Sequence, residues 1–362
     1  MKRRPRILID ALAYGPSDGG FTTALHDLLE SCCQIEEFEF VVAHHARHGE
    51  IFKHWDVKAA PVRFPYKLRF LASLLLLPRL TRRLRADAVH CEISALPFAL
   101  AVPGSVTAHD LFALLRPDVG GRTLGKRALT SIYWRRIFVA SLRRARVLKA
   151  ISETTAADVR RLIGETLPVA VVPPRIDAPA APAEPRAWPS PAEPLRLLFL
   201  GSVVPRKNLA FLLRALGRVE RDWRLDVVGN TWWGMSELTP ALSDPRITVH
   251  GYVSDERREA LLGGCDALVA PSLYEGFGYP VAEAMARGRL VLTSEIAAYR
   301  EFVPPGCRFD LDDPAALARL IEDLDAKTYE RLLPACRESV ARFTGERHVE
   351  RHRLLFQELT AA

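Results

Sequence analysis

The chain has 362 residues, which is long enough for two domains of ordinary size. Its 49% hydrophobic and 26% charged residues exclude a disordered protein, and the longest largely apolar run, the eight residues Phe70–Leu77, is too short to span a bilayer. The net charge of +7 is unevenly placed, because residues 1–174 hold 26 Lys and Arg against 16 Asp and Glu, whereas the rest hold 24 against 27. The basic first half predicts an anionic partner on that side, either a phosphate-bearing molecule or an anionic lipid surface.

The N-terminal sequence MKRRPRILID passes directly into a strand pattern, without the apolar core and cleavage site of a secretory signal. The cysteines are scattered without metal-ligand spacing, so we expect no disulfide framework and a reducing, cytoplasmic compartment. They are Cys32, Cys33, Cys91, Cys265, Cys307 and Cys336.

Strand-like and helix-like segments alternate along the chain, which is typical of parallel α/β sheets. In the first half we predict strands at Arg6–Leu12, Glu39–Ala43, Ala88–Cys91, Ser105–Ala108, Val147–Ile151 and Val169–Val172, and helices near Phe21–Cys32, Leu68–Leu84, Arg122–Arg144 and Thr154–Ile163. Pro173–Pro194 then carries eight prolines without an apolar period, which predicts an interdomain linker.

The second half repeats the alternation. We predict strands at Leu195–Leu200, Leu225–Val228, Ile247–Val249, Asp266–Pro271 and Leu290–Thr293, and helices near Leu209–Val219, Asp255–Gly263, Pro280–Arg287, Ala315–Leu324, Tyr329–Phe343 and His348–Thr360.

Two features of the first half follow the carboxyl end of a strand, where open α/β sheets bind ligands. Gly19 and Gly20 form a turn before the first helix, and this is either a plain turn or a loop that approaches a ligand. His109, in the triplet HDL, directly follows the strand Ser105–Ala108 and is either structural or a ligand contact.

The most informative segment is SLYEGFGYPVAE, which lies between a buried strand and a helix. Gly276 and Gly278, on either side of Phe277, let the backbone approach a ligand, and the positive end of the next helix favours a phosphate or another anionic group. Glu275 lies in the loop and Glu283 one turn into the helix, so each carboxylate can accept from a separate hydroxyl group.

This segment resembles the signature of the family 4 retaining glycosyltransferases, S-x-x-E-G-F-G-x-P-x-x-E-A-M-A-x-G, which the chain matches from Ser272 through Gly288. The resemblance implies a GT-B fold, in which two Rossmann-like domains with parallel sheets face an interdomain cleft. It places the acceptor on residues 1–174 and the nucleotide-sugar donor on residues 195–345, with residues 175–194 as linker and no metal required. It also implies that the last helix, residues 346–362, packs back on the N-terminal domain.

The resemblance implies a role for each candidate residue. Arg206 and Lys207 precede a helix, where the dipole disfavours cations, and they match the R-K pair that binds the donor diphosphate in the family. By the same analogy Glu275 contacts the transferred sugar and Glu283 the ribose hydroxyls. His109 looks like the histidine of mannosyl- and rhamnosyl-transferring relatives that positions the sugar near the reacting carbon, while the donor phosphate itself takes the acceptor proton.

Residues 250–255 (HGYVSD) match the loop that holds the nucleobase in relatives, which makes Val253 and Asp255 candidate donor contacts. Asp255 either accepts from a guanine ring or only caps the following helix. Gly19 and Gly20 are similar to the family's glycine-rich loop near the donor phosphates and the acceptor. The resemblance to mannosyl- and rhamnosyl-transferring relatives favours GDP-mannose as the donor, with a rhamnose donor second.

Other segments leave alternatives open. Trp232 and Trp233 either line the sugar site or pack into the core, and Asp310-Leu311-Asp312 reads as a solvated turn rather than a metal triplet. Tyr66–Arg85, with six cations, and Arg122–Arg146, with eight, are either membrane-binding surfaces or helices with a buried leucine face and solvated arginines.

We therefore expect a retaining hexosyltransferase that requires no metal or cofactor. Its expected partners are a nucleoside-diphosphate sugar, a glycan or polyprenyl-diphosphate-linked acceptor, and the inner face of the plasma membrane. The process would be surface polysaccharide or lipopolysaccharide synthesis. The alternative enzyme class is a sugar-nucleotide epimerase or hydrolase of the same architecture, which acts on the donor alone.

Two further classes are disfavoured. We expect no nucleic-acid partner, because no basic-aromatic motif accompanies the pI of 9.2. A dinucleotide oxidoreductase is disfavoured because no G-x-G-x-x-G follows the first strand of either half.

Overall fold

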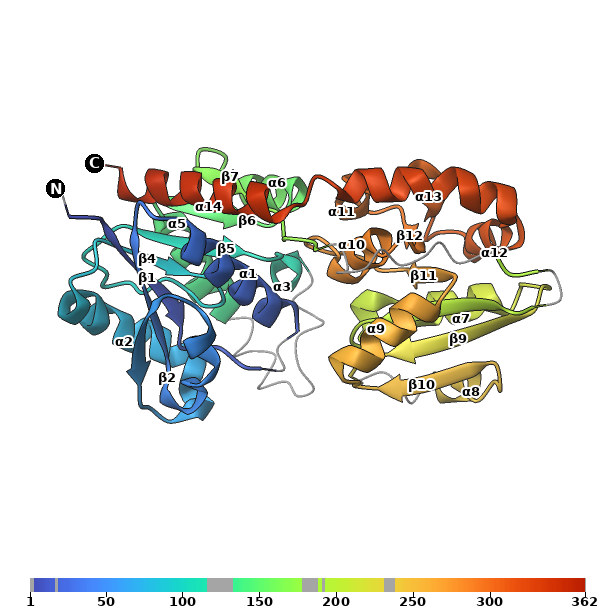
Figure 1. The fold of residues 1–362 in the computed structure, drawn as a ribbon, viewed down its shortest axis with the longest axis horizontal. Coiled ribbons are helices and arrows are strands. Elements are labelled where there is room, and N and C mark those ends of the chain that lie inside the picture. The colour runs from blue at the N-terminus through green and yellow to red at the C-terminus, as the bar shows by residue number, and fades with distance from the viewer. Residues whose placement is uncertain are drawn as a thin grey trace. The chain divides into compact units, whose positions relative to one another are not determined.

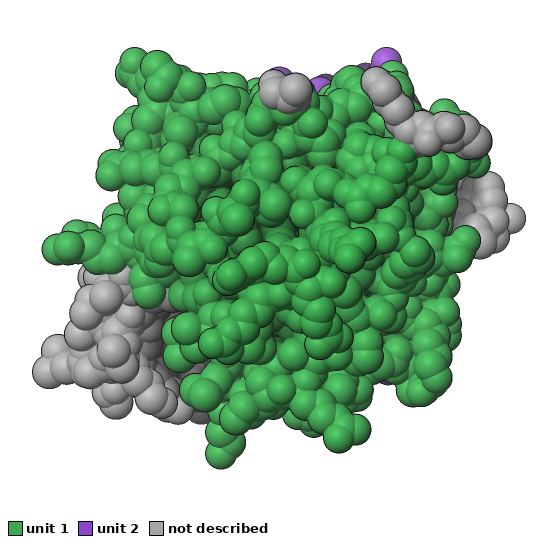
Figure 2. Space-filling model, turned by 90° about the vertical axis from the view of Figure 1, so that its left-hand side faces the viewer, with its two compact units in different colours: residues 1–175, 345–362 green, residues 176–344 purple. Residues whose placement is uncertain are grey.

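The computed structural model describes residues 3–16, 19–115, 133–177, 188–190, 193–230 and 238–361 (Figure 1). The chain forms two compact units. Unit 1 comprises residues 1–175 and 345–362, and unit 2 comprises residues 176–344. Figure 2 shows one face of unit 1.

Unit 1 is built on a parallel sheet whose strand order is β3-β2-β1-β4-β5-β6-β7. Its strands are β1 (Arg6–Ala11), β2 (Glu39–His45), β3 (Lys58–Val62), β4 (Ala88–Cys91), β5 (Gly104–Ala108), β6 (Val147–Ala150) and β7 (Val169–Val171). Its helices are α1 (Gly20–Gln34), α2 (Arg69–Leu84), α3 (Phe112–Leu115), η5 (Tyr133–Phe138), α5 (Val139–Arg144), α6 (Glu153–Leu162) and α14 (Gly345–Thr360). Apolar residues line both faces of this sheet, as expected for a buried parallel sheet.

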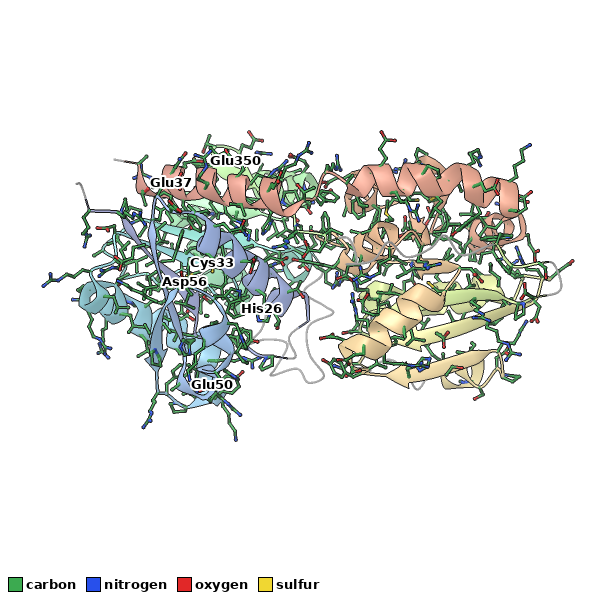
Figure 3. All side chains as sticks on the ribbon, in the orientation of Figure 1. His26, Cys33, Glu37, Glu50, Asp56 and Glu350 are labelled. Atoms are coloured by element: carbon green, nitrogen blue, oxygen red, sulfur yellow. The ribbon has the colours of Figure 1, made fainter. Side chains whose placement is uncertain are left out.

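The last helix of the chain belongs to unit 1. Leu355, Phe356 and Leu359 of α14 are buried in the same core cluster as Ile7, Ile9 and the inner face of α1. At the surface, Arg353 of α14 pairs with Glu350 at 2.6 Å and with Glu37, just after α1, at 3.4 Å. Figure 3 labels these two glutamates. The apolar contacts supply most of the attachment, since exposed ion pairs contribute only about 0–1 kcal/mol each.

Unit 2 is built on a second parallel sheet, with strand order β10-β9-β8-β11-β12-β13. Its strands are β8 (Leu195–Leu200), β9 (Trp223–Val228), β10 (Ile247–Gly251), β11 (Ala267–Ala270), β12 (Leu290–Ser294) and β13 (Arg308–Phe309). Its helices are η6 (Pro205–Lys207), α7 (Leu209–Leu216), α8 (Thr239–Leu242), α9 (Asp255–Gly264), α10 (Tyr279–Ala286), α11 (Ala297–Arg300), α12 (Pro314–Glu322) and α13 (Ala326–Val340). Two parallel sheets with alternating helices confirm the predicted α/β class.

Two strands were missing from the sequence prediction, and both lie at the edge of a sheet. β3 contains Pro61, which lacks a backbone N–H and is tolerated in edge strands. β13 is only two residues long. Most of the predicted helix Arg122–Arg144 lies outside the described residues, and its last part is the π-helical turn η5 followed by α5.

Parts of the predicted linker pack against unit 2. The N–H of Ile176 donates to the carbonyl oxygen of Phe343 at 2.9 Å. The ring of Trp188 lies 5.0 Å from that of Tyr329. All six cysteines are free thiols, and among the described residues no helix is long and apolar enough to cross a membrane.

Candidate active site

The loop of residues 271–278 leads from strand β11 into helix α10. Gly278, the N-cap residue, has a φ of 108°, and a Cβ there would lie 2.5 Å from Cε1 of the buried Tyr299. Glycine is therefore required at this position. Phe277 is buried and stacks on Phe302 with ring centroids 5.0 Å apart, so any ligand contact by this residue is through its main chain. The positive end of α10 favours an anionic ligand.

Glu275 is the centre of a compact charged cluster. Its Oε1 accepts from Lys207 Nζ at 2.6 Å and from Ser272 Oγ at 2.7 Å, and its Oε2 accepts from Arg206 Nη1 at 2.8 Å. The side chain is only 6% exposed. Burial alone raises the pKa of Glu275, but Lys207 and Arg206 outweigh burial and hold the pKa at about 2. Glu275 is therefore a buried, ionised carboxylate rather than a solvent-exposed loop side chain.

Two cations and one anion leave this cluster with an excess of one positive charge. Arg206 also donates from Nη1 to the carbonyl oxygen of Tyr274 at 3.1 Å, and the carbonyl oxygen of Arg206 accepts from Leu273 N at 2.8 Å. These contacts fix the turn η6 against the loop after β11. A preorganised positive site of this kind can stabilise charge that develops on a leaving phosphate.

The loop after β10 leads into helix α9. Ser254 is the N-cap residue of α9, and its side chain accepts from Arg257 N at 3.3 Å. Asp255 is the first helical residue and is exposed, so the alternative that Asp255 caps the helix is wrong. Val253 precedes the cap and is partly exposed. Asn208 is the N-cap residue of α7, but its side chain makes no capping hydrogen bond.

Glu283 lies on α10, and its carboxylate pairs with Arg258 of α9. The Glu283 side chain is 19% exposed. The signature segment therefore provides two carboxylates in different environments, since Glu275 is enclosed by cations and Glu283 has one cationic partner and access to solvent.

In unit 1, Gly19 and Gly20 begin helix α1. Gly19 has a φ of 62°, which favours glycine, and its carbonyl oxygen accepts from Thr22 N at 2.9 Å and Thr23 N at 3.2 Å. The preceding Ser17 and Asp18 lie outside the described residues.

His109 directly follows strand β5, and its ring is held in one orientation. Nε2 lies 2.8 Å from the carbonyl oxygen of Glu92, and the ring makes an edge contact with Phe21 at 4.8 Å between centroids. A carbonyl only accepts, so Nε2 carries the proton and Nδ1 presents a lone pair. Nδ1 has no hydrogen-bond partner among the described residues. Burial lowers the pKa of His109, which favours the neutral ring.

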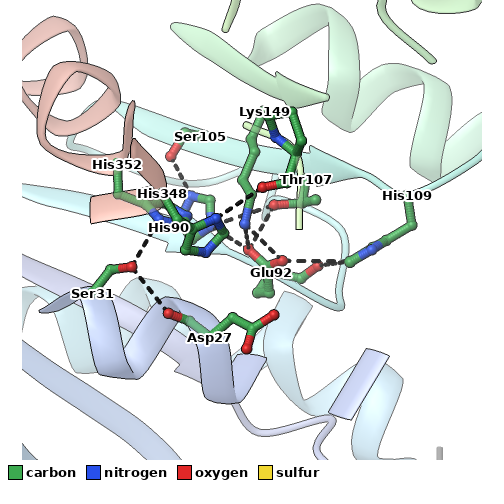
Figure 4. Close-up of polar contacts among 11 residues, drawn as sticks. Asp27, Ser31, His90, Glu92, Ser105, Thr107, His109, Lys149, His348 and His352 are labelled. Carbon is green, nitrogen blue, oxygen red and sulfur yellow. Dashed lines mark hydrogen bonds and ion pairs between the residues drawn. The ribbon is translucent and has the colours of Figure 1, made fainter. Parts of the chain in front are cut away.

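A buried polar network lies behind His109 (Figure 4). The fully buried Glu92 accepts from Lys149 Nζ at 3.0 and 3.1 Å and from Thr107 Oγ1 at 2.8 Å, and its Oε2 lies 2.8 Å from His90 Nε2. Burial raises the pKa of Glu92, but Lys149 and His90 more than offset it and hold the pKa well below its ordinary value. Glu92 and Lys149 are therefore a buried ion pair across β4, β5 and β6.

Sequence reasoning missed this network. Its members are single polar residues in otherwise apolar strands, at alternate positions that place them on one face of the sheet. The signal was present in the charged and imidazole side chains of AVHCE and VLKA, because charged residues are rare inside buried parallel strands.

Three further predictions concern the tryptophan pair, the Asp310-Leu311-Asp312 triplet and metal binding. Trp232 and Trp233 lie outside the described residues. Asp310 and Asp312 are exposed, and Asp310 Oδ1 accepts from Asp312 N at 2.9 Å, which is a turn motif. Among the described residues, no group of three His, Cys, Asp or Glu side chains is arranged to hold a metal ion.

Helix α2 combines a buried and an exposed apolar face. Leu77 and Leu80 are buried, whereas Leu68 (the N-cap residue), Phe70, Leu71 and Leu75 are 50%, 45%, 46% and 68% exposed. The cations of the last two turns, Arg79, Arg82 and Arg83, are exposed. Exposed apolar side chains next to arginines are typical of surfaces that contact lipid or a protein partner.

Two family profiles match the chain. The profile described as Glycosyltransferase Family 4 matches residues 18–180, and the profile described as Glycosyl transferases group 1 matches residues 194–326. The first therefore covers most of unit 1, and the second covers the part of unit 2 that contains the Glu275 cluster.

Curated relatives are similar over shorter stretches. The chain is 40% identical over 119 residues to the MMP alpha-(1->4)-mannosyltransferase of Mycolicibacterium hassiacum, which covers 30% of this chain and 28% of that protein. It is 30% identical over 148 residues to O-antigen chain mannosyltransferase B of Escherichia coli, which covers 38% of this chain and 39% of that protein. The chain thus spans less than two fifths of the length of these relatives.

Among solved structures, sucrose-phosphate synthase from Thermosynechococcus elongatus is similar over 99% of this chain and 100% of its own, with a TM-score of 0.73 and 18% identity. At this identity the likeness shows the fold. Together with the two parallel-sheet units, it confirms the predicted GT-B architecture.

Proposed function

We propose a function for this chain on the basis of its family: it belongs to the family 4 glycosyltransferases. It transfers a hexose from a nucleoside-diphosphate sugar to a glycan acceptor in surface polysaccharide synthesis. The observation that carries the proposal is the buried Glu275 enclosed by Arg206 and Lys207, next to the glycine turn into α10. The names of the curated relatives favour mannose as the transferred sugar, and we propose GDP-mannose as its donor.

In this proposal Arg206 and Lys207 neutralise the diphosphate as the bond to the sugar breaks. A diphosphate carries more negative charge than the single positive excess of the cluster, so the α10 N-terminus adds to its stabilisation. Glu275 accepts three hydrogen bonds, one each from Arg206, Lys207 and Ser272, and a carboxylate has about four acceptor sites. One site therefore remains for a sugar hydroxyl.

His109 serves as a neutral acceptor. With Nε2–H committed to the carbonyl oxygen of Glu92, Nδ1 can accept from a hydroxyl of the sugar but cannot donate to it. We assign His109 to orienting the sugar near the reacting carbon, with Gly19 and Gly20 close to the donor phosphates. The transfer is retaining, and the donor phosphate takes the proton of the acceptor hydroxyl.

We further propose that no divalent metal is required, because the two cations of the cluster can supply the charge stabilisation that a metal would otherwise give. The second candidate function is a sugar-nucleotide epimerase or hydrolase, which shares the architecture and acts on the donor alone. The two candidates differ in whether product formation depends on an acceptor.

We also propose that unit 1 works at an anionic membrane, at the cytoplasmic face, on a lipid-linked acceptor such as a polyprenyl diphosphate. The exposed Leu68, Phe70, Leu71 and Leu75 of α2 and the nearby arginines support this part of the proposal. Each Lys or Arg near such a surface contributes about 1 kcal/mol.

A donor screen tests the proposal. Release of free nucleoside diphosphate is followed with GDP-mannose, GDP-rhamnose, dTDP-rhamnose, UDP-glucose and UDP-N-acetylglucosamine, with and without membrane extract as acceptor, and in excess chelator. We expect acceptor-dependent release from GDP-mannose that survives chelation. Acceptor-independent turnover would favour the epimerase or hydrolase. A strong preference for a UDP-sugar would reject the donor assignment, and restoration of lost activity by Mn²⁺ or Mg²⁺ would reject metal independence.

A further inference from the structure

Four charged side chains tie helix α9 to helix α10. Arg258 donates from Nη1 to Glu259 Oε1 at 3.0 Å and from Nη2 to Glu283 Oε2. Arg287, at the end of α10, donates from Nε and Nη2 to the two oxygens of Glu259 at 2.6 and 2.9 Å. Two cations and two anions give this group, which we name the α9–α10 clamp, no net charge.

The Glu283 carboxylate is anchored on one side only. Its Oε2 pairs with Arg258, whereas Oε1 has no hydrogen-bond partner among the described residues. The carboxylate therefore has a fixed orientation with one open acceptor oxygen. A group held in this way loses little conformational freedom when a ligand hydroxyl binds to it.

Arg258 is suited to this task by its shape. The planar guanidinium presents its two terminal nitrogens in a fixed fork, and here the fork divides between Glu259 on its own helix and Glu283 on the neighbouring one. The side chain is 25% exposed, so it can be replaced without opening a core cavity. Among the described residues, the hydrogen bonds of the Arg287 side chain go to the carboxylate of Glu259 and, from Nη1 at 3.0 Å, to the carbonyl oxygen of Glu283.

We propose that Arg258 is a positioning residue for donor binding, which orients the Glu283 carboxylate so that Oε1 accepts from the ribose hydroxyls of a nucleoside diphosphate. This inference rests on the proposed function. Through Arg258, helix α9 is joined to Glu283, the residue that the family resemblance assigns to the ribose. The first residue of α9, Asp255, is also the last residue of the loop that the resemblance assigns to the nucleobase. Recognition of the base and recognition of the ribose are thereby mechanically linked.

Removal of Arg258 has two separable consequences. First, the clamp then holds two anions and one cation, and this net negative charge repels any nucleotide. Second, the Glu283 carboxylate loses its orientation, and this affects only ligands with ribose hydroxyls. Arg258→Lys keeps the charge but lacks the fork. Arg287→Gln also removes one cation from the clamp but leaves the Arg258–Glu283 pair in place, and it is therefore the matched control.

The test is calorimetric binding of GDP, UDP and their 2′,3′-dideoxy counterparts to the full chain. In the wild type we expect the hydroxyl-bearing nucleotide of the preferred base to bind about tenfold more tightly than its dideoxy form. Arg258→Gln and Glu283→Gln should each bring this ratio of affinities to about one. Arg258→Lys should lower the ratio. Arg287→Gln should weaken both ligands alike and preserve the ratio.

The outcomes separate the two levels of the argument. A wild type that binds neither GDP nor UDP contradicts the proposed function and the inference together. A wild type that binds and discriminates, with the ratio unchanged in Arg258→Gln, overturns the role of Arg258 alone. Thermal unfolding of each variant identifies any loss of ratio that comes from misfolding, and a folded Arg258→Gln protein with a ratio near one supports the proposal.

Discussion

Units 1 and 2 each carry a buried glutamate paired with cations just after the carboxyl end of a strand, but the two clusters are assembled differently. The partners of Glu275 come from two short segments, Arg206–Lys207 and Ser272. The cluster is mostly buried and lies next to the glycine turn before α10. Glu92 meets His90, Thr107 and Lys149 across three strands, and it is sealed from solvent. In our proposal the first cluster meets an anionic ligand, whereas the second holds other residues in place.

The largest expected effect concerns the sealed cluster. Lys149→Met leaves Glu92 buried without its cation, which should cost about 3–5 kcal/mol of unfolding free energy, whereas the double variant Glu92→Gln/Lys149→Met should recover most of this loss. Urea unfolding measures both. The exposed pair Lys53–Glu50 in the same unit is the control, since Lys53→Met should cost less than about 1 kcal/mol. Equal costs at the two sites would mean that Glu92 is not charged in the folded protein.

Glu275 should affect turnover more than stability. Glu275→Gln keeps the shape and the hydrogen bond with Ser272 but holds two cations poorly, so we expect kcat to fall about 10²-fold, which is about 3 kcal/mol of barrier. Steady-state kinetics with saturating donor provides the measurement. Glu295→Gln, which changes the ion pairs of Glu295 with the exposed Arg300 and the mostly buried Arg308 in the same unit, should leave kcat unchanged. A Glu275→Gln enzyme within about threefold of the wild type would reject the assignment.

The third effect is a difference in acid sensitivity between the units. All the histidines whose pKa is lowered lie in unit 1: His26, His44, His48, His90, His109, His348 and His352. Burial and Lys149 lower the pKa of His348 from 6.5 to about 4. The ring Nε2 atoms of His348 and His352 are buried and have no hydrogen-bond partner among the described residues, so protonation leaves an unsatisfied N–H.

The sign follows from the lowered values. Between pH 6.5 and about 4 the unfolded chain binds more protons than the folded one, so stability is full above pH 6.5 and is lost as the pH falls. His348 alone accounts for about 2 kcal/mol at pH 5. In unit 2, Glu275 stays ionised down to about pH 2. Hydrogen exchange, corrected for its intrinsic pH dependence, should therefore show peptides of unit 1 opening before those of unit 2 on acidification. Simultaneous opening of both units would contradict this order.

The smallest expected effect is at the surface of unit 1. Leu75 is the most exposed apolar residue of α2, and Leu75→Ser should weaken binding to anionic vesicles about fivefold, or about 1 kcal/mol. Cosedimentation at low salt measures the change, and 1 M salt should reverse binding of the wild type because screening shortens to about 3 Å. Leu354, an exposed leucine of α14, is the control position. Equal binding to neutral and anionic vesicles would contradict a role of α2 in binding anionic membranes and would mean that it is an ordinary surface helix.

The sequence predicted the candidate site of unit 2 better than that of unit 1, for a physical reason. The loop and helix around Gly278 are specified by neighbouring residues, so their pattern is legible in one short segment. The register between β4, β5 and β6 is set by pairing between residues far apart in the sequence. The local sequence therefore does not predict that Glu92 and Lys149 are in contact. Local competition explains why the capping alternative for Asp255 is wrong, because Ser254 and Asp255 are both good caps and the structure uses the serine.

The position of α14 has a consequence for how the protein is made. Residues 176–344 contain all of unit 2, whereas the sheet face that Leu355, Phe356 and Leu359 cover belongs to unit 1. On the ribosome, chains grow at roughly 5–20 residues per second. This sheet face therefore stays uncovered for on the order of 10–40 s between the synthesis of residue 175 and that of α14. The unit that begins first is therefore completed last, and we expect the nascent unit 1 to be the part that chaperones protect.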